Sequence, residues 1–362
     1  MKVINVVGAR PNYMKIAPVM QEMKKDPKRF SSILVHTGQH YDREMSQLFF
    51  EDLKMPRPDI NLRAGSGTHA QQTARIMVRF EKILLCERPD LVVVAGDVNS
   101  TLACALVAKK LHIKVAHIEA GLRSFDMRMP EEINRKLTDA ISDYLFTPSL
   151  DANENLAREG LSKDKIYFVG NVMIDTLLRF KKLAEKRDIL KRYKLSKARY
   201  ALLTLHRPEN VDNKKNFQTI ISALDTISKE MPVLFSVHPR TKQKIRDFGF
   251  KRYFRGEIKL LPPLGYLDFV NLMMNSRFIL TDSGGIQEES CILKVPCLTL
   301  RENTERSVTT ICGGNFITGA KTNKILEGFD KVMQGQMRVI KTPKLWDGKA
   351  SQRIVSVLKN IV

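Results

Sequence analysis

The sequence predicts an α/β fold with two domains, each built on a parallel β-sheet. Short runs of β-branched and apolar residues alternate with longer amphipathic stretches, a pattern typical of βαβ units. The pattern starts again near residue 200, and 362 residues are enough for two domains of ordinary size. We place the boundary near Gly170, which gives domains over 1–170 and 171–348. The Lys- and Arg-rich segment 181–197 predicts an exposed helix and turn at the start of the second domain.

In the first domain, the apolar runs and the 3.6-residue periodicity predict alternating strands and helices. The expected strands lie at 3–7, 32–37, 91–95, 114–118, 144–147 and 167–169. The expected helices lie at 17–25, 43–53, 71–87, 101–110, 131–142 and 151–159.

The second domain repeats this alternation. Its expected strands lie at 200–204, 233–237, 258–261, 278–281, 297–300 and 315–318, and its expected helices include 214–230, 266–275, 286–293 and 323–334. Ligands of such sheets bind outside the carboxyl ends of the strands, so we expect the active site in a cleft between the two domains.

Composition narrows the class of protein. Hydrophobic residues make up 43% and charged residues 27%, which is ordinary for a globular chain and excludes a mainly disordered one. Lys and Arg number 60 against 39 Asp and Glu, so the net charge of +21 favours an anionic partner. The basic residues are spread along the chain without interleaved aromatic residues, which favours an anionic small molecule over nucleic acid.

The sequence gives no sign of a membrane, disulfide or zinc protein. No apolar run approaches about 18 residues, and the β-branched start of the chain predicts a first strand and not a signal peptide. Five cysteines in apolar surroundings, without a CxxC pair, indicate reduced and mostly buried thiols. We therefore expect a cytoplasmic protein.

The first motif, GARPNYMK at 8–15, follows the first predicted strand. A glycine at a strand-to-helix turn lets the backbone approach an anion, and the helix N-terminus attracts negative charge. Arg10 offers a planar fork for phosphate oxygens, and Lys15 falls about one helical turn later. An ordinary βα turn with a surface Arg is the alternative interpretation. Neither the dinucleotide-binding nor the P-loop glycine pattern is present.

Three carboxylates follow strands of the same predicted sheet. Asp97 lies in GDVNST, Glu119 in HIEAGLRS, and Glu131 in PEEINR. Each alone fits a structural role, since Asp is a common N-cap and acidic residues favour the first helical turn. Together at one sheet edge they repel one another, which costs free energy and raises the pKa of at least one carboxyl toward the range of acid–base catalysts. We therefore interpret the set as functional.

The second domain carries candidate groups for binding an anion. His206 and Arg207 follow its first strand, and His238 follows its second. The segment Asp282–Glu289 follows a strand with Ser-Gly-Gly opening a helix, which predicts a phosphate cradle. Glu288 or Glu289, one turn later, could accept both hydroxyls of a ribose. The segment 301–306 is either a cleft rim or a cluster of salt bridges.

These motifs, taken in order, resemble the non-hydrolysing UDP-N-acetylglucosamine 2-epimerases. The resemblance rests on GARPNYMK, GDVNST, HIEAGLRS, PEEINR, LHRPEN at 205–210, HPR at 238–240, DSGGIQEE at 282–289 and LWDGKASQRI at 345–354. Two segments depart from the family pattern. Ala9 and Asn12 stand where many members have Thr and Glu, and 39–45 is two residues longer than the Gln-His-Arg-Glu-Met of members regulated by a second UDP-sugar.

The resemblance implies two Rossmann-like domains of the glycosyltransferase-B type, with a final helix at about 349–362 that packs back on the first domain. It places UDP on Ser283 and Gly284 at the diphosphate, Glu289 at the ribose and Phe269 near the uracil, with Arg10 reaching the diphosphate. The catalytic positions it implies are Asp97, Glu119, Glu131 and His206. The remaining residues expected to bind UDP or substrate are Lys15, Arg135, Arg207, His238, Gly285 and Arg306.

The expected reaction is C2 epimerisation of UDP-N-acetylglucosamine to UDP-N-acetylmannosamine, through elimination of UDP to a 2-acetamidoglucal and re-addition. A hydrolysing epimerase that releases N-acetylmannosamine, a 2-epimerase of a UDP-diacetamido sugar acid, and a glycosyltransferase of the same fold are the alternatives. We expect no metal, no redox cofactor, and no nucleic-acid or membrane partner. We also expect a homodimer that serves the synthesis of cell-surface polysaccharide.

Overall fold

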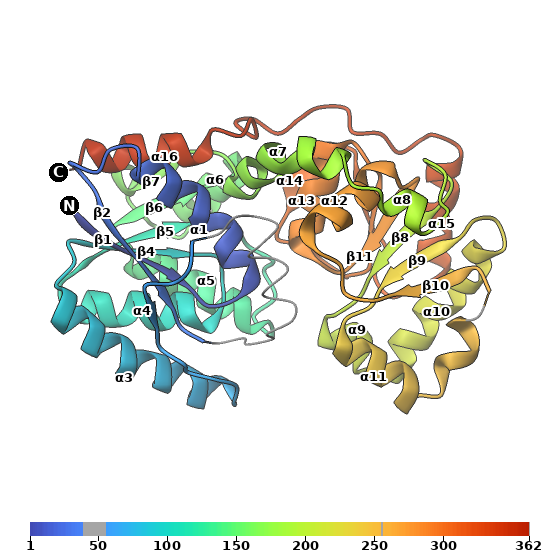
Figure 1. The fold of residues 1–362 in the computed structure, drawn as a ribbon, viewed down its shortest axis with the longest axis horizontal. Coiled ribbons are helices and arrows are strands. Elements are labelled where there is room, and N and C mark those ends of the chain that lie inside the picture. Colours follow the sequence, from blue (N-terminus) through green and yellow to red (C-terminus); the bar gives the residue numbers. More distant parts are fainter. Residues whose placement is uncertain (39–55, 255, 362) are drawn as a thin grey trace. The chain divides into compact units, whose positions relative to one another are not determined.

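The computed structural model describes residues 1–38, 56–254 and 256–361, apart from the side chain of Arg10. The chain forms two compact units (Figure 1). Unit 1 comprises Met1–Arg179 and Lys344–Val362, and unit 2 comprises Phe180–Pro343. Each unit contains one parallel sheet with helices packed on it, so the predicted α/β class with two parallel sheets is confirmed.

The described part of unit 1 contains a seven-stranded sheet in the order β3-β2-β1-β4-β5-β6-β7, and all neighbours pair in parallel. Its strands are β1 (Lys2–Val7), β2 (Ser31–His36), β3 (Ile60–Asn61), β4 (Leu91–Ala95), β5 (Lys114–Ile118), β6 (Tyr144–Thr147) and β7 (Ile166–Phe168). The short strand β3 carries no run long enough for sequence periodicity to detect. The order reverses between β1 and β4, which is the switch point where ligands of such sheets bind.

Helices cover both faces of this sheet. They are α1 (Arg10–Met23), α3 (His69–Glu87), α4 (Asn99–Lys110), α5 (Pro130–Ile141), α6 (Leu150–Arg158) and α16 (Ala350–Lys359), with a short 3₁₀ helix at Lys163–Lys165. Helix α7 (Val172–Glu185) begins in unit 1, and its residues from Phe180 onward belong to unit 2. The helices α1 and α16 pack together on one face, and α3, α4 and α5 follow one another on the opposite face (Figure 1). The helix predicted over 43–53 lies outside the described residues.

Helix α1 begins earlier than the predicted range 17–25. It starts at Arg10, directly after the β1 turn, because Pro11 suits the first helical turn and Asn12 closes that turn. The Asn12 Oδ1 accepts hydrogen bonds from the backbone N–H groups of Gly8 (3.2 Å) and Ala9 (2.9 Å). The earlier start places Lys15 in the second turn of the helix, beside the end of the sheet.

The described part of unit 2 contains a six-stranded parallel sheet in the order β10-β9-β8-β11-β12-β13. Its strands are β8 (Ala201–Thr204), β9 (Val233–Ser236), β10 (Ile258–Leu261), β11 (Phe278–Thr281), β12 (Cys297–Thr299) and β13 (Asn315–Ile317). Its helices are α8 (Ile189–Arg192), α9 (Pro208–Val211), α10 (Lys214–Ser228), α11 (Pro239–Asp247), α12 (Tyr266–Asn275), α13 (Gly284–Leu293), α14 (Ser307–Ile311) and α15 (Thr322–Met333), with a 3₁₀ helix at Phe250–Phe254. The switch point lies between β8 and β11.

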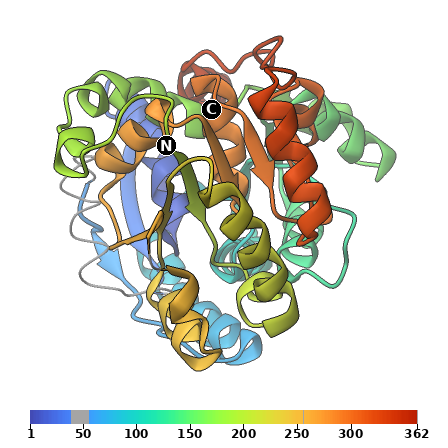
Figure 2. The same cartoon turned by 90° about the vertical axis from the view of Figure 1, so that its right-hand side faces the viewer.

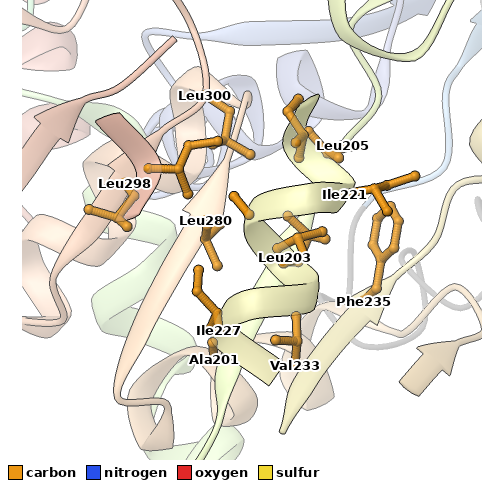
Figure 3. Packing of buried hydrophobic residues seen from close by; sticks show 14 of the residues in the cluster. Ala201, Leu203, Leu205, Ile221, Ile227, Val233, Phe235, Leu280, Leu298 and Leu300 are labelled. Carbon is orange, nitrogen blue, oxygen red and sulfur yellow. The ribbon is translucent and has the colours of Figure 1, made fainter. Parts of the chain in front are cut away.

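The core of unit 2 forms where α10 and α15, side by side in Figure 2, pack on the sheet. Ile221 of α10 lies beside Phe235 of β9, and Ile227 of α10 and Leu203 of β8 belong to the same cluster (Figure 3). These side chains are almost completely buried, and each contributes roughly 1.5–3 kcal/mol relative to exposure in water. This packing fixes the strands whose carboxyl ends carry the candidate site.

The last segment of the chain belongs to unit 1 and is fixed there by polar contacts. Trp346 is buried and donates from Nε1 to the Pro148 carbonyl (2.9 Å). Asp175 in α7 accepts hydrogen bonds at the start of α16, from the N–H groups of Ala350 (3.1 Å) and Ser351 (2.7 Å) and from the Ser351 hydroxyl (2.6 Å). A buried carboxylate thus caps a helix that is far away in sequence.

Replacing this carboxylate should loosen the terminal helix. We expect Asp175→Ala to lower the free energy of unfolding by about 1.5–3 kcal/mol, because buried N–H groups lose a charged acceptor. Ser351→Ala removes only the hydroxyl contact and should cost about 1 kcal/mol. Urea unfolding followed by circular dichroism measures both variants. Equal losses in the two variants would show that Asp175 does not cap the helix.

Candidate active site

The candidate residues of unit 1 lie at the carboxyl ends of the strands around its switch point. The Gly8–Lys15 segment follows β1, Asp97 follows β4, and Glu119 follows β5. Glu131 lies in the first turn of α5, after the loop that follows β5. The side chain of Arg10 and the segment 39–45 lie outside the part of the chain that the structure describes.

Lys15 and Glu119 form a buried ion pair beside the backbone of Gly96. A Cβ at position 96 would lie 3.1 Å from the Lys15 Nζ and 3.3 Å from the Glu119 Oε2, and Gly96 itself has a φ of +71°. Only glycine combines this backbone conformation with room for the ion pair. Glu119 also adopts a left-handed φ of +74°, a strained conformation that residues at functional sites often show.

Asp97 is held by a second cation. Buried Arg135 of α5 donates from Nη2 (2.6 Å) and Nε (3.1 Å) to the Asp97 Oδ2, and from Nη1 (2.5 Å) to Glu132. Glu132 in turn accepts from the N–H groups of Ser124 (3.0 Å) and Phe125 (2.9 Å). Two predicted carboxylates are therefore paired with cations, while Glu131 is half-buried at the start of α5.

A buried network that sequence reasoning missed supports the loop at Gly96. His117 of β5 donates from Nε2 to the Gly96 carbonyl (2.8 Å), and its Nδ1 lies 2.7 Å from Asp139. Asp139 also meets Arg123 at 2.7 Å. Burial opposes ionisation of Asp139, but His117 and Arg123 outweigh it and lower the pKa of this carboxyl. His117 and Arg123 both belong to the HIEAGLRS motif, so this motif was the sequence signal that could have indicated the network.

In unit 2, Asp282 organises the loops after β8 and β11. Its carboxylate is completely buried and accepts from the N–H groups of His206 (3.1 Å) and Arg207 (2.9 Å). The His206 Nδ1 lies 2.9 Å from Asp282, with its imidazole half-exposed. Burial opposes ionisation of Asp282, but His206 and the backbone donors lower the pKa of its carboxyl. Sequence reasoning assigned no role to Asp282, although it lies in the DSGG motif.

The segment predicted to form a phosphate cradle lies at the start of α13. Ser283 is the residue before the helix and makes no side-chain capping hydrogen bond, and Gly284 and Gly285 form the first turn. All three residues are partly exposed. The N–H groups of a first helical turn lack partners within the helix, so this end of α13 suits an anion.

The other predicted residues of unit 2 differ in burial. Glu289 is buried and accepts a hydrogen bond from the Tyr266 hydroxyl (2.7 Å), while Phe269 is partly buried on the same helix as Tyr266. Arg306 is buried against Glu288 (2.7 Å). His238 is exposed, and its Nδ1 accepts from the Arg240 N–H (3.2 Å) at the start of α11.

The segment 301–306 forms salt bridges in the structure. Arg301 donates to Glu305 (2.7 Å), and Arg306 contacts both Glu288 and Glu305. The carboxylate of Glu305 lies against the backbone of Gly284, where a Cβ would come within 2.7 Å of its Oε1. This salt-bridge cluster therefore packs directly under the first turn of α13.

The described residues include no group of three or more His, Cys, Asp or Glu side chains placed to hold a metal ion. In the same part of the chain, no helix has the length and apolar character needed to cross a bilayer. Cys86 is exposed, and the other four cysteines are buried as free thiols.

A two-unit parallel α/β fold with carboxylates, cations and a helix N-terminus at its strand ends is typical of enzymes that act on anionic ligands. A family model described as UDP-N-acetylglucosamine 2-epimerase matches residues 21–359. The chain therefore belongs to the UDP-N-acetylglucosamine 2-epimerase family of enzymes.

Similar proteins match over their whole length. A UDP-N-acetylglucosamine 2-epimerase of Methanocaldococcus jannaschii is 46% identical, with 99% of each chain covered. A UDP-2,3-diacetamido-2,3-dideoxy-D-glucuronate 2-epimerase of Pseudomonas aeruginosa is 42% identical over 100% of both chains. A crystal structure of the M. jannaschii enzyme in complex with UDP-GlcNAc and UDP matches with a TM-score of 0.91 at 44% identity, covering 99% of this chain and 100% of that one.

The role of Asp282 predicts how stability depends on pH. Its pKa is lower in the folded protein, so its ionised form contributes stability above the unfolded-state pKa of about 3.9, and this contribution is lost as the pH falls through the folded-state value. We expect Asp282→Asn to cost about 1.5–3 kcal/mol at pH 7 and less near pH 3.

Urea unfolding at several pH values between 7 and 3 measures this difference. Asp225→Asn, at an exposed position of α10, is the matched control and should change little at any pH. A constant cost of Asp282→Asn across this pH range would refute the assignment.

Proposed function

We propose that this protein interconverts UDP-N-acetylglucosamine and UDP-N-acetylmannosamine by inverting C2. The observation that carries the proposal is the full-length similarity to the M. jannaschii enzyme, whose crystal structure contains UDP-GlcNAc and UDP. The buried Lys15–Glu119 pair and the partly exposed Asp97 beside Arg135 supply groups suited to moving a proton at the strand ends of unit 1.

The C2 proton is not next to a carbonyl group, so direct removal is difficult and elimination provides a route. A carboxylate takes the C2 proton while the C1–O bond to UDP breaks, which leaves a 2-acetamidoglucal and bound UDP. A second group then returns a proton to the opposite face of C2, and a diphosphate oxygen of UDP adds to C1. We assign these proton transfers to Asp97, Glu119 and Glu131, and leave open which residue serves which face.

Negative charge grows on the diphosphate as the C1–O bond breaks, so cations and N–H donors accelerate this step. We assign this role to His206, Arg207 and the first turn of α13, together with Arg10. Asp282 supports the assignment because it fixes the backbone that carries both His206 and Arg207. Glu289 and Phe269 are assigned to the ribose and the uracil, and Lys15 and Arg135 position the carboxylates they contact.

The similarity to the P. aeruginosa enzyme favours a second candidate substrate. That protein is named for a UDP-2,3-diacetamido sugar acid and is 42% identical over the full chain, close to the 46% of the M. jannaschii relative. A hydrolysing reaction would share the elimination and then add water. A glycosyltransferase needs no proton removal at C2, so it would not require the three carboxylates of unit 1, and we consider it the weaker alternative.

Nuclear magnetic resonance of UDP-N-acetylglucosamine with the enzyme in D₂O tests the proposal. Epimerisation puts deuterium at C2 of a UDP-sugar and forms UDP-N-acetylmannosamine. Free N-acetylmannosamine with UDP would establish hydrolysis instead. An unlabelled C2 would overturn the proposal, and parallel incubation with the diacetamido sugar acid would then identify the alternative substrate.

The proposal includes a homodimer in the cytoplasm that serves surface-polysaccharide synthesis without a metal or a redox cofactor. The elimination route transfers no hydride, so it needs no redox cofactor, and in the proposal the cations and N–H donors named above balance the charge on the diphosphate without a metal ion. Activity that is lost with EDTA and restored by a divalent cation would contradict this part of the proposal.

The carboxylates should affect turnover more than nucleotide binding. We expect Asp97→Asn, Glu119→Gln and Glu131→Gln each to lower kcat by roughly 10²–10⁴-fold, with much smaller effects on the Kd of UDP. Glu154→Gln, an exposed position of unit 1, should leave kcat unchanged. Near-normal turnover in all three variants would leave these carboxylates with structural roles only.

Glu289 should affect nucleotide binding. Glu289→Gln replaces the charged carboxylate that accepts hydrogen bonds from the ribose with a neutral amide, so we expect the Kd of UDP to rise about 10–150-fold. Tyr266→Phe removes the neighbouring hydroxyl but keeps the carboxylate, and should have a smaller effect. Calorimetry with UDP measures both variants, and an unchanged Kd in Glu289→Gln would exclude the ribose contact.

A further inference from the structure

Asn171 has a buried amide group that the proposed reaction does not use. The residue is only 3% exposed, and its Nδ2 has no hydrogen-bond partner among the residues that the structure describes. Buried amide donors are nearly always paired, because an unpaired one loses its hydration without compensation. An acceptor supplied by a ligand would satisfy this donor.

The orientation of this amide is fixed by its surroundings. The Asn171 Oδ1 accepts from the Met173 N–H (2.9 Å) at the start of α7, which leaves the Nδ2 as the available end. Gly170, directly before it, has a φ of +87°, and a Cβ there would lie 2.1 Å from the Leu345 carbonyl oxygen. The backbone before Asn171 is therefore held against the returning C-terminal segment.

Asn171 lines a small cavity of unit 1 together with Glu119, one of the proposed acid–base residues, and Lys15, the ion-pair partner of Glu119. The cavity is lined by Lys15, Ile118, Glu119, Pro148, Gly170, Asn171 and Val172. Lys15 donates to Glu119 there, so Asn171 adds a neutral donor next to a carboxylate that we assign to chemistry at C2. The substituent on C2 of the proposed substrate is an acetamido group, whose acyl oxygen is a strong neutral acceptor.

We propose that the Asn171 Nδ2 donates a hydrogen bond to the acyl oxygen of the 2-acetamido group and thereby selects N-acylated sugars. This inference rests on the proposed function, because the role of Glu119 brings C2 to this cavity. The contact leaves UDP itself untouched. It predicts discrimination between an acetamido and a hydroxyl group at C2, which a site built around a buried donor achieves well.

The test compares three ligands on matched variants. Asn171→Ser is neutral and keeps an oxygen that can accept from the Met173 N–H, but its hydroxyl is too short to replace the Nδ2. Asn171→Asp keeps the Oδ1 contact and removes the donor. Calorimetry gives the Kd of UDP-N-acetylglucosamine, UDP-glucose and UDP for each variant and for the wild type, and thermal melting checks the fold.

We expect the wild type to bind UDP-N-acetylglucosamine more tightly than UDP-glucose. In both variants, the Kd of UDP-N-acetylglucosamine should rise about 3–10-fold, while the Kd values of UDP-glucose and UDP stay unchanged. Equal weakening of all three ligands would show that Asn171 only maintains the fold. Equal weakening of both sugars would assign the donor to another sugar oxygen. Unchanged binding, or a wild type without preference for the acetamido group, would also overturn the proposal.

This outcome can be separated from that of the proposed function. If the wild type binds UDP-N-acetylglucosamine but gives no labelled product in D₂O, the proposed reaction fails while the binding comparison still decides the role of Asn171. If labelled product forms and the variants retain wild-type affinities, the reaction stands and the Asn171 contact is wrong.

Discussion

The carboxyl ends of parallel strands leave the N–H groups of the following loops without partners in the sheet, and these groups need acceptors. In this chain, buried carboxylates provide them. Asp282 accepts from the loop after β8, Asp139 from Gly121 (3.1 Å), and Glu132 from Ser124. The loops that carry the candidate site are therefore shaped by carboxylates that we do not place in contact with the substrate.

Much of the fold could be predicted because the central strands of both sheets are almost completely buried. All five residues of β4, Leu91–Ala95, are buried, so the strand is a continuous apolar run that local sequence reveals. The end of each apolar run marks the end of a strand, so the polar residues that follow it lie at the strand ends. This reasoning predicted the positions of Asp97, Glu119 and His206. Their placement follows from the geometry of a parallel sheet and needs no knowledge of tertiary contacts.

The partners of these residues could not be predicted, because they depend on which side of a helix faces inward. Glu131 and Glu132 are neighbours in sequence, yet about 100° of helical rotation leaves one half-buried and turns the other toward Arg135. Sequence reasoning chose Glu131 and gave Glu132 no role. Similarly, the pairing of Arg135 with Asp97 joins residues from different elements that no local pattern connects.

The return of the chain to unit 1 has a consequence for its synthesis. Unit 2 is one continuous stretch, Phe180–Pro343, whereas unit 1 also needs Trp346 and α16 from the last residues. Because domains fold as their residues emerge from the ribosome, the second unit is complete in sequence before the first. Until α16 has been synthesised, the surface of α1 that α16 covers remains exposed, so the nascent chain presents apolar surface that the folded protein buries.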